Sequence, residues 1–431
     1  MPGFYEFFAG GGMARLGLGA HWNCLLANDF SEKKAQAYRA NFPPADELVR
    51  GDVYNLTTAD LPGQAELAWA SFPCQDLSLA GRQKGLSGER SGSFWGFWRL
   101  MQGLQAEGRP VPLIVLENVV GTISARDGAD FMVLLDTLIS AGYRVGPMAL
   151  NAVHWLPQSR PRLFIVAAHR SLNIPPQLMA YTPNDFAHTT GLRAAFANAS
   201  NEIRQAWVWW NLPKPPPRKT ALIDLIEENP QGVRWHAPEE TQRLLDLMQP
   251  GHRAKVSEAQ KHGRMVGTIY RRIRANERGE KAQVAEVRFD GISGCLRTGS
   301  GGSSKQFILL VAGDQLRSRL LAPREAARLM GVPETYILPD NYSEAYHLLG
   351  DGLAVPVVSW LEQRLLGPLL EGQTIPVEMP VPGAVDGEKV SIRARHLRSA
   401  GRVTSDPVNQ QPIPSYTSAS TGTRSSARAM T

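Results

Sequence analysis

Short apolar runs alternate with segments of helical periodicity through about the first 170 residues. The runs have the length of buried strands, and the segments between them have the apolar spacing of amphipathic helices. This alternation predicts a parallel sheet that is covered on both faces by helices. The expected strands are residues 3–10, 24–30, 66–72, 112–118 and 162–168, and the expected helices are residues 13–20, 31–42 and 131–143.

The periodic pattern weakens after residue 180. A Pro-rich stretch at 213–219 and a Gly- and Ser-rich stretch at 299–305 flank a basic segment, which indicates a separate, irregular domain. Helical periodicity returns at 323–332, where a proline precedes good helix formers. The chain beyond residue 370 is rich in Pro, Ser, Thr, Gly and Arg, a composition typical of disorder. The predicted segments are the first part of a large domain at 1–180, a second domain at 181–296, a return segment completing both at 297–370, and a disordered tail at 371–431.

Composition indicates a globular protein, because 43% of the residues are hydrophobic and 20% are charged. The three cysteines, Cys24, Cys74 and Cys295, are far apart and form no CxxC pair, which argues against a disulfide framework and against a zinc site. A single cysteine is most often a small buried hydrophobe, and we expect this of Cys24 and Cys295. No signal-peptide pattern and no run of 18 apolar residues is found, so we expect a cytoplasmic protein without a membrane partner and without a metal.

Positive charge is concentrated in one segment. Between His252 and Arg278 there are eight Lys or Arg and two acidic residues, and this excess of six equals the formal net charge of the whole chain. A dense basic cluster fits a phosphate-binding face. Runs of charge are more often solvated surface, so the charge alone leaves nucleic-acid binding open.

Three successive strand ends carry groups that suit an adenosine-containing ligand. Gly10 and Gly12 lie between a strand and a helix, where backbone N–H groups can approach a ligand, although a tight packing turn would also use them. Asp29 ends the second strand and could accept ribose hydroxyls, and Asp52 ends a third. The turn lacks GK[ST] and does not match GxGxxG, which argues against a P-loop and disfavours a nicotinamide cofactor.

Further along, PCQ at 73–75, ENV at 117–119 and QSRPRLF at 158–164 follow apolar runs. With the late segments PREAARLMG at 323–331 and GDGLAVPVV at 350–358, this set resembles the DNA (cytosine-5) methyltransferase family, in the family's order. The resemblance implies an α/β fold, with a Rossmann-like S-adenosylmethionine-dependent methyltransferase sheet and a smaller, irregular target recognition domain. In that family the last motif folds back beside the first.

S-adenosylmethionine is the cofactor that this resemblance implies. Glu6 and Asp351 depart from the Asp and Asn that are common in the family, but both keep oxygen acceptors, so altered ligand contacts are expected rather than loss of function. The predicted cofactor-binding residues are Phe8, Ala9, Gly10, Gly12, Asp29, Phe30, Asp52, Val53, Pro73, Phe94, Asp351 and Val355.

Catalytic roles follow from the chemistry of cytosine, whose C5 is a poor nucleophile until a group adds to C6. A thiolate suits this addition, and the resemblance assigns it to Cys74, which enters a loop of Gly, Ser and Arg. Glu117 is expected to hold N3 as a hydrogen-bond donor or acid, because an idle carboxylate is unfavourable at the end of an apolar run. Arg160 is assigned to O2, with Arg162 organising the site.

Double-stranded DNA is the implied substrate, and the target base must leave the duplex to be reached. Arginines of the basic segment are expected to divide between phosphate and base-edge contacts. The predicted DNA-binding residues are Gln75, Ser78, Ser87, Arg271, Arg272, Arg274, Arg297 and Ser303. The resemblance also implies a monomer that serves restriction–modification or phage self-protection, with a cognate restriction endonuclease as a partner.

Three other hypotheses stay open at this point. An RNA cytosine-C5 methyltransferase of the same fold is disfavoured, because no CFT-type motif of the tRNA-modifying branch is found. A DNA-binding protein that kept the fold and lost catalysis is disfavoured by intact Cys74, Glu117 and Arg160. A dehydrogenase is disfavoured by the missing GxGxxG.

Overall fold

The computed structural model describes residues 1–73, 92–275, 279–297 and 305–371. The predicted disordered tail lies, from residue 372 onward, outside the described residues. Among the residues that are described, no helix is long and apolar enough to cross a membrane.

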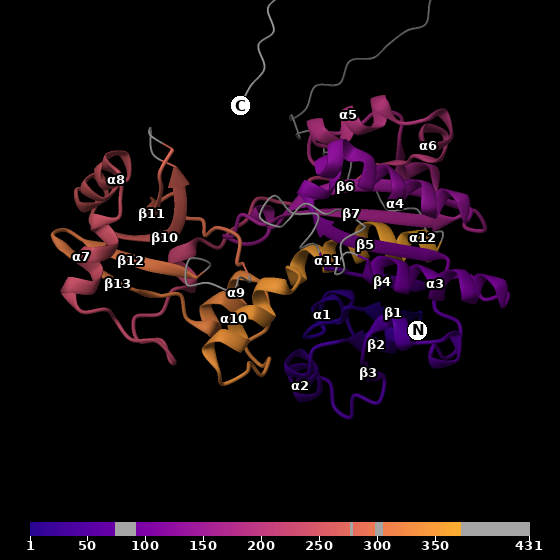
Figure 1. Ribbon diagram of the computed structural model, residues 1–431, viewed down its shortest axis with the longest axis horizontal. Helices are drawn as coiled ribbons and strands as arrows, with labels where there is room; N and C mark the ends of the chain where they lie inside the picture. Colours follow the sequence, from indigo (N-terminus) through magenta and orange to yellow (C-terminus); the bar gives the residue numbers. More distant parts are fainter. Residues whose placement is uncertain (74–91, 276–278, 298–304, 372–431) are drawn as a thin grey trace, which may run out of the picture. The chain divides into compact units, whose positions relative to one another are not determined.

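The larger sheet has seven strands in the order β3-β2-β1-β4-β5-β7-β6 (Figure 1). All neighbouring pairs are parallel except those of β7, which runs antiparallel to both β5 and β6. The predicted α/β fold is therefore confirmed, and the sheet is parallel, as expected, except at β7. Its strands are β1 (Gly3–Phe7), β2 (Asn23–Asp29), β3 (Leu48–Arg50), β4 (Leu67–Ala70), β5 (Leu113–Val119), β6 (Tyr143–Asn151) and β7 (Pro161–His169).

Strand β6 is absent from the sequence-based prediction. Gly146 and Pro147 interrupt its apolar pattern, and proline is tolerated there because β6 forms the edge of the sheet, with β7 as its neighbouring strand. A Cβ at Gly146 would lie 1.9 Å from the Trp210 indole nitrogen, so the glycine makes room for a buried tryptophan.

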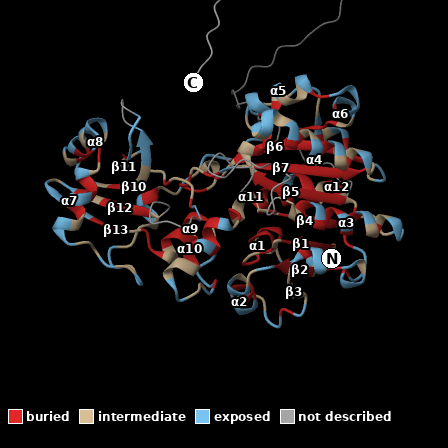
Figure 2. Ribbon diagram, in the orientation of Figure 1, coloured by how far each residue is buried: buried red, intermediate tan, exposed pale blue. Residues whose placement is uncertain are grey.

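Helices cover both faces of this sheet, and Figure 2 shows that its strands are buried on both. Alternate residues of β5 serve opposite layers: Leu113 and Val115 belong to one apolar core, and Ile114 and Leu116 to the other. Helices α1 and α11 lie in the first layer, and α3 and α4 in the second. The helices of the large sheet are α1 (Met13–Leu18), α2 (Glu32–Asn41), α3 (Ser93–Ala106), α4 (Ala129–Ser140), α11 (Val355–Leu361) and α12 (Gly367–Glu371).

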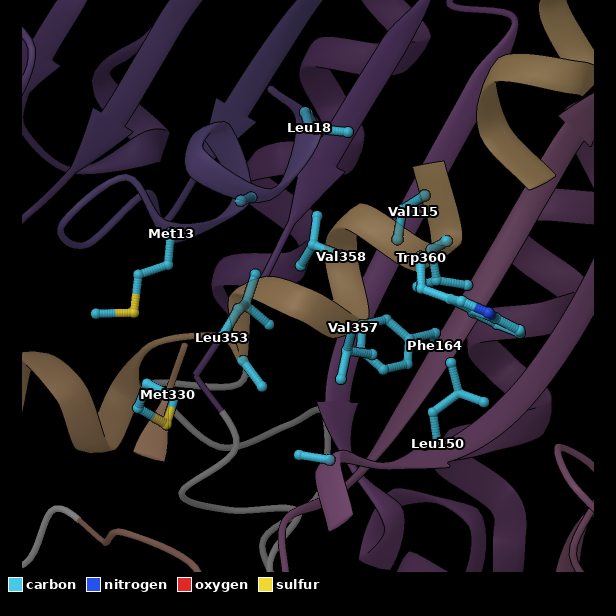
Figure 3. Packing of buried hydrophobic residues seen from close by; sticks show 14 of the residues in the cluster. Met13, Leu18, Val115, Leu150, Phe164, Met330, Leu353, Val357, Val358 and Trp360 are labelled. Carbon is cyan, nitrogen blue, oxygen red and sulfur yellow. The ribbon is translucent and has the colours of Figure 1, made fainter. Parts of the chain in front are cut away.

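The end of the chain's ordered part packs beside its beginning. In α11, the Ser359 hydroxyl donates a hydrogen bond to the Gly17 carbonyl of α1 at 2.9 Å. A Cβ at Gly17 would lie 2.4 Å from Val358, so only glycine permits this approach. Figure 3 shows the side chains of α11 packed near Leu18 and Phe164. This contact between α11 and α1 agrees with the family resemblance, which implies that the last motif folds back beside the first.

A second sheet of four antiparallel strands has the order β11-β10-β12-β13. The middle of the chain was expected to be irregular, yet this sheet is regular and has its own apolar core with α7 and α8. This sheet contains strands from before and after residue 296, where the sequence analysis placed a domain boundary. The predicted domain boundaries stay predictions. The elements of this part are α7 (Pro238–Asp246), α8 (Pro250–Gln260), β10 (Arg264–Ala275), β11 (Lys281–Arg288), β12 (Gln306–Ala312) and β13 (Gln315–Leu320).

Several short elements connect the two sheets along the chain. A two-stranded ribbon and two helices follow β7, and two helices follow β13. These elements are β8 (Met179–Ala180), α5 (Thr190–Asn198), α6 (Asn201–Ala206), β9 (Trp209–Trp210), α9 (Pro323–Leu329) and α10 (Tyr342–Asp351).

A fully buried ion pair links β13 to α9. Arg319 donates two hydrogen bonds to Glu325, at 2.6 and 2.8 Å, and neither side chain is exposed. Arg319 also donates to the Glu227 carbonyl at 2.7 Å, and Glu325 accepts from the Glu227 and Ala322 N–H groups at 2.8 Å each. Removing one partner would leave the other charge buried and unpaired.

We expect Glu325→Gln to lower the free energy of unfolding by about 3–5 kcal/mol, the usual loss when one partner of a buried pair is removed. The matched control is Glu334→Gln, which removes a carboxylate that is 61% exposed and paired with Arg328; it should cost at most about 1 kcal/mol. Urea unfolding of both variants measures the difference. Equal losses of unfolding free energy in the two variants would show that the buried ion pair contributes no more than the exposed one.

Candidate active site

The turn between β1 and α1 holds its backbone open toward solvent. Phe8, Gly10 and Gly12 have positive φ angles of 60°, 59° and 75°. A Cβ at Gly10 would meet nothing within 4 Å, whereas one at Gly12 would lie 2.3 Å from the Phe42 ring. Gly10 therefore offers open space to a ligand, and Gly12 is required by packing. Ala9, between them, is buried.

Asp29 at the end of β2 fixes this turn. One carboxylate oxygen accepts the Gly10 N–H at 2.8 Å, and the other accepts the Ser31 N–H at 2.7 Å. The next residue, Phe30, is 75% exposed, an unusual position for a large apolar ring at a strand end. A buried carboxylate beside an exposed aromatic ring suits a ribose with its attached base, because each oxygen keeps a further lone pair.

The other predicted cofactor contacts on this side differ in exposure. Asp52 caps a short 3₁₀ helix (Val53–Asn55), and its Oδ1 accepts the Tyr54 N–H at 3.0 Å. Val53 and Phe94 are buried in the apolar core, where the Phe94 ring lies 5.5 Å from that of Phe72. Because both side chains are buried, they can support the predicted cofactor site only through packing.

Glu6, the departure from the family's aspartate, lies under the glycine turn. It is 2% exposed, and its carboxyl accepts hydrogen bonds from the Ala14 and Arg15 backbone N–H groups. Its Oε2 has no hydrogen-bond partner among the described residues. Burial raises the pKa of Glu6 to about 8, although the nearby Arg15 acts in the opposite direction. The carboxyl group is therefore mostly protonated at neutral pH.

Asp351 and Val355 come from the late segment. The Asp351 carboxylate pairs with Lys34 of α2 at 2.7 Å and remains 42% exposed. The Val355 N–H donates to the Met330 carbonyl at 2.9 Å and begins α11. A cavity of about 350 Å³ lies between α2 and α10, and its lining includes Ser31, Lys34 and Asp351. This cavity adjoins the strand end that carries Asp29.

Glu117 ends the apolar part of β5 next to a guanidinium group. Arg162 on the neighbouring strand β7 places its Nε 3.2 Å from Glu117 Oε1, and the two side chains are 17% and 10% exposed. Burial raises the pKa of Glu117, and Arg162 and Arg160 only partly counter this effect. The Ser71 side chain also hydrogen-bonds to the carboxyl group. Glu117 is thus suited to carry a proton and donate it.

Arg160 has a different environment from the one expected. Its Nη1 donates to the Leu296 carbonyl at 3.1 Å, and its Nη2 donates to the Gly350 and Gly352 carbonyls at 2.9 and 2.6 Å. The side chain is 2% exposed, so these carbonyls occupy the donors that were assigned to the base. The structure places Arg162 beside Glu117 and Arg160 among backbone carbonyls. The assignment of Arg160 to O2 stays a prediction.

The predicted nucleophile lies just beyond the described chain, and so do four predicted DNA contacts. The described chain stops at Pro73, directly after Phe72, whose carbonyl accepts a hydrogen bond from Asn118 Nδ2 at 3.3 Å. Because Asn118 follows Glu117, this hydrogen bond ties Phe72 to the end of β5. The residues outside the described chain are Cys74, Gln75, Ser78, Ser87 and Ser303.

Cys295, expected to be an ordinary buried cysteine, instead lies among the charged groups of the site. Its Sγ is 3.4 Å from Arg160 Nη1 and 3.8 Å from both terminal nitrogens of Arg162. Burial alone would raise the pKa of this thiol, but Arg160 and Arg162 outweigh burial, and the net shift is downward. The local sequence does not distinguish Cys295 from a cysteine that only packs in a core. The one available signal was the position of GCLR, residues 294–297, soon after the basic segment.

The basic segment includes most of α8 and the whole of β10. Arg272 and Arg274 lie on one face, and both pair with Glu286 of β11, at 3.3 and 2.6 Å. Arg271 lies on the other face, where its guanidinium is 5.2 Å from the centre of the Phe307 ring. Glu286 thus offsets part of the charge expected to face DNA. Arg297 is exposed, and no group of three or more metal-ligating side chains is found in the described part of the chain.

The sheet order, the open turn after β1 and the polar strand ends define an α/β protein whose strand ends have the polarity that a nucleoside requires. The chain matches the family described as C-5 cytosine-specific DNA methylase over residues 3–366. It therefore belongs to that family, and the expected class of enzyme, a DNA cytosine-C5 methyltransferase, is confirmed.

Individual relatives agree with this assignment. The chain is 25% identical over 369 residues to the type II methyltransferase M.BsuFI of Bacillus subtilis, covering 84% of this chain and 73% of the relative. It is also 25% identical over 367 residues to M.HhaI of Haemophilus parahaemolyticus, covering 84% and 93%. The Dnmt2 methyltransferase structure from S. pombe covers 86% of this chain and 99% of its own, with a TM-score of 0.50 and 18% identity. This last likeness concerns the fold alone.

The raised pKa of Glu6 makes stability depend on pH. As pH rises from the carboxyl's ordinary pKa of 4.5 to about 8, the unfolded chain loses the Glu6 proton while the folded chain keeps it, so folding becomes less favourable. We expect Glu6→Gln, which stays neutral, to unfold at a higher temperature than wild type, by a margin that grows across this window.

Thermal unfolding between about pH 5 and about pH 8 measures this margin. Glu239→Gln, which alters an exposed carboxylate of α7, is the control and should give a nearly constant difference. A constant difference for Glu6→Gln would show that Glu6 is ionised in the folded protein.

Proposed function

We propose that this protein transfers a methyl group from S-adenosylmethionine to C5 of cytosine in double-stranded DNA. The transfer passes through a covalent bond between Cys74 and C6 of a base that has left the duplex. The observation that carries this proposal is the buried pair of Glu117, with its raised pKa, and Arg162. They lie beside the strand end that leads to Cys74.

The residues at the ends of β1, β2 and β3 fit the cofactor. Open space at Gly10, the buried Asp29 carboxylate and the exposed Phe30 ring match the polarity and size of an adenosine group. Asp52 would accept a hydrogen bond from the adenine amino group, and Asp351 lies where the late motif approaches the turn. S-adenosylmethionine supplies an electrophilic methyl group on a sulfonium when it is bound.

Addition to C6 is the step that the chain's own residues promote. The Cys74 sulfur forms a bond to C6, and the electron pair of the C5–C6 double bond is drawn into the ring toward N3 and O2. Glu117 donates its proton or a hydrogen bond to N3, and Arg162 stabilises the charge at O2. C5 becomes nucleophilic and accepts the methyl group.

Release reverses the addition. A base removes the proton from C5, the C5–C6 double bond forms again, and the Cys74 sulfur leaves C6. Glu117 recovers a proton as N3 gives it back. The two carboxyl states that this cycle requires are both accessible, because burial and the arginines act on the pKa of Glu117 in opposite directions.

DNA is held by groups of the second sheet and the loops beside it. Arg271, Arg272, Arg274 and exposed Arg297 supply positive charge for phosphates and base edges. Relatives such as M.BsuFI are type II methyltransferases, so we also propose a role in restriction–modification, with a cognate endonuclease that cuts the same site.

The test is methyl transfer by the purified protein. Wild type, Cys74→Ala and the control Cys24→Ala are incubated with labelled S-adenosylmethionine and unmethylated genomic DNA, and the modified bases are mapped. We expect C5-methylcytosine at one repeated sequence from wild type and from Cys24→Ala. Cys74→Ala should lose at least about a thousandfold in rate, because the variant lacks the thiolate that is proposed to add to C6.

Other outcomes separate the rival functions. Transfer to RNA instead of DNA would indicate an RNA methyltransferase, and sequence-specific DNA binding without transfer would indicate a binding protein that has lost catalysis. Transfer by Cys74→Ala at the wild-type rate would exclude Cys74 as the nucleophile.

A further inference from the structure

Cys295 is held in place by the chain on both sides of it. Ser293 exchanges backbone hydrogen bonds with Pro157 and Ser159, each at 2.8 Å. On the other side, the Leu296 N–H donates to the buried Gln158 side chain at 3.2 Å. Because the backbone is fixed before and after Cys295, its sulfur has a defined position against the two guanidinium groups.

Without a negative charge on the Cys295 sulfur, the positive charges around it are not balanced. Arg160 and Arg162 are two cations whose terminal nitrogens both approach Cys295 Sγ. Glu117 is the carboxyl group next to them, and its proposed task requires a proton. With Glu117 neutral, the carboxylate that still acts on Arg160 is Asp351, which is 42% exposed and already paired with Lys34. Two largely buried positive charges would then lie side by side with little compensation, which is unfavourable unless a further anion is present.

We infer that Cys295 is a positioning residue whose thiolate balances Arg160 and Arg162, keeps Arg162 in place beside Glu117, and allows Glu117 to keep its proton. This inference rests on the proposed function, because it assigns Glu117 the task of a proton donor. It adds a second functional thiol, which forms no bond to the base.

Cys295 also connects the second sheet with the proposed catalytic groups. The Gly294 N–H donates to the Tyr270 hydroxyl of β10, next to Arg271 and Arg272. Cys295 therefore lies between the sheet expected to read DNA and the arginine expected to contact the base. A shift of this short segment would move the sulfur relative to Arg162.

The pH dependence follows from the groups that face these side chains. Cys295 is influenced by Arg160, Arg162 and Arg297, and Glu117 by Arg162, Arg160, Ser71 and Asp351. Tyr346 of α10 is also close enough to sense the thiolate. Replacing Cys295 by a neutral residue leaves both guanidinium charges acting on Glu117, so the pKa of Glu117 falls and the protonated fraction at a given pH decreases.

The first experiment compares Cys295→Ser with Cys295→Asp in the methyl-transfer assay under single-turnover conditions. Cys295→Ser should lower the rate about tenfold and move the alkaline limb of the pH–rate profile about one unit toward lower pH, as loss of a neighbouring anion requires. Cys295→Asp restores a negative charge and should recover most of the lost pH range. Cofactor affinity should change less than about twofold in both variants, because the thiol does not touch that site.

A merely structural role predicts the opposite order. Serine, which is close to cysteine in size, would then behave like wild type, aspartate would be the worse substitution, and the pH profile would not move. That result would overturn the inference.

The second experiment needs no enzymatic activity. The ultraviolet absorbance of the thiolate is titrated between about pH 6 and about pH 9 in wild type, Cys295→Ser and Arg162→Gln. The difference between wild type and Cys295→Ser should show a thiolate that is present at neutral pH, and Arg162→Gln should move its titration to higher pH. Cys24 contributes nothing in this range, because burial raises its pKa to about 12.

The two experiments fail in distinguishable ways. If the wild type transfers no methyl group but Cys295 titrates as a thiolate under the control of Arg162, the proposed function is wrong and the charge balance holds. If methyl transfer occurs and Cys295 remains a thiol at neutral pH, the inference about Cys295 is wrong and the proposed function holds.

Discussion

The buried guanidinium of Arg160 is the constraint on which the site depends. A buried cation is tolerated only where its N–H donors find acceptors, and Arg160 finds them in the carbonyls of Leu296, Gly350 and Gly352. These carbonyls come from the segment after β11 and from the end of α10. One side chain thus requires its own strand and two later parts of the chain, each more than a hundred residues from Arg160 in sequence, to meet at the carboxyl end of β5.

The remaining site follows from this junction. With Arg160 occupied by the backbone, Arg162 two residues later is left to face Glu117, and the Cys295 sulfur is brought between the two arginines. Asn118 links the end of β5 to Phe72, two residues before Cys74. The edge that we propose for the cofactor is built separately. Asp29 holds the Gly10 turn there, and the late segment reaches this edge through the pair of Asp351 and Lys34.

The sequence was sufficient for the parallel part of the sheet, because its strands are continuous apolar runs, and for the polar strand ends that carry Asp29 and Glu117. It was insufficient for β6, where Gly146 and Pro147 hide an edge strand. The different environments of Arg160 and Arg162 could not be foreseen, because the environment of Arg160 depends on carbonyls from remote segments. Cys295 was missed for the same reason: its neighbours in space are not its neighbours in sequence.

The most direct test of the account is covalent trapping. DNA in which 5-fluorocytosine replaces cytosine is incubated with the protein and S-adenosylmethionine; fluorine at C5 cannot leave as a proton, so the adduct persists. After digestion, mass spectrometry identifies the residue that is attached to the base. The account predicts a stable complex attached through Cys74, and one that Glu117→Gln forms far more slowly. Attachment through another residue, or methyl transfer to normal DNA without any trapped complex, would contradict it.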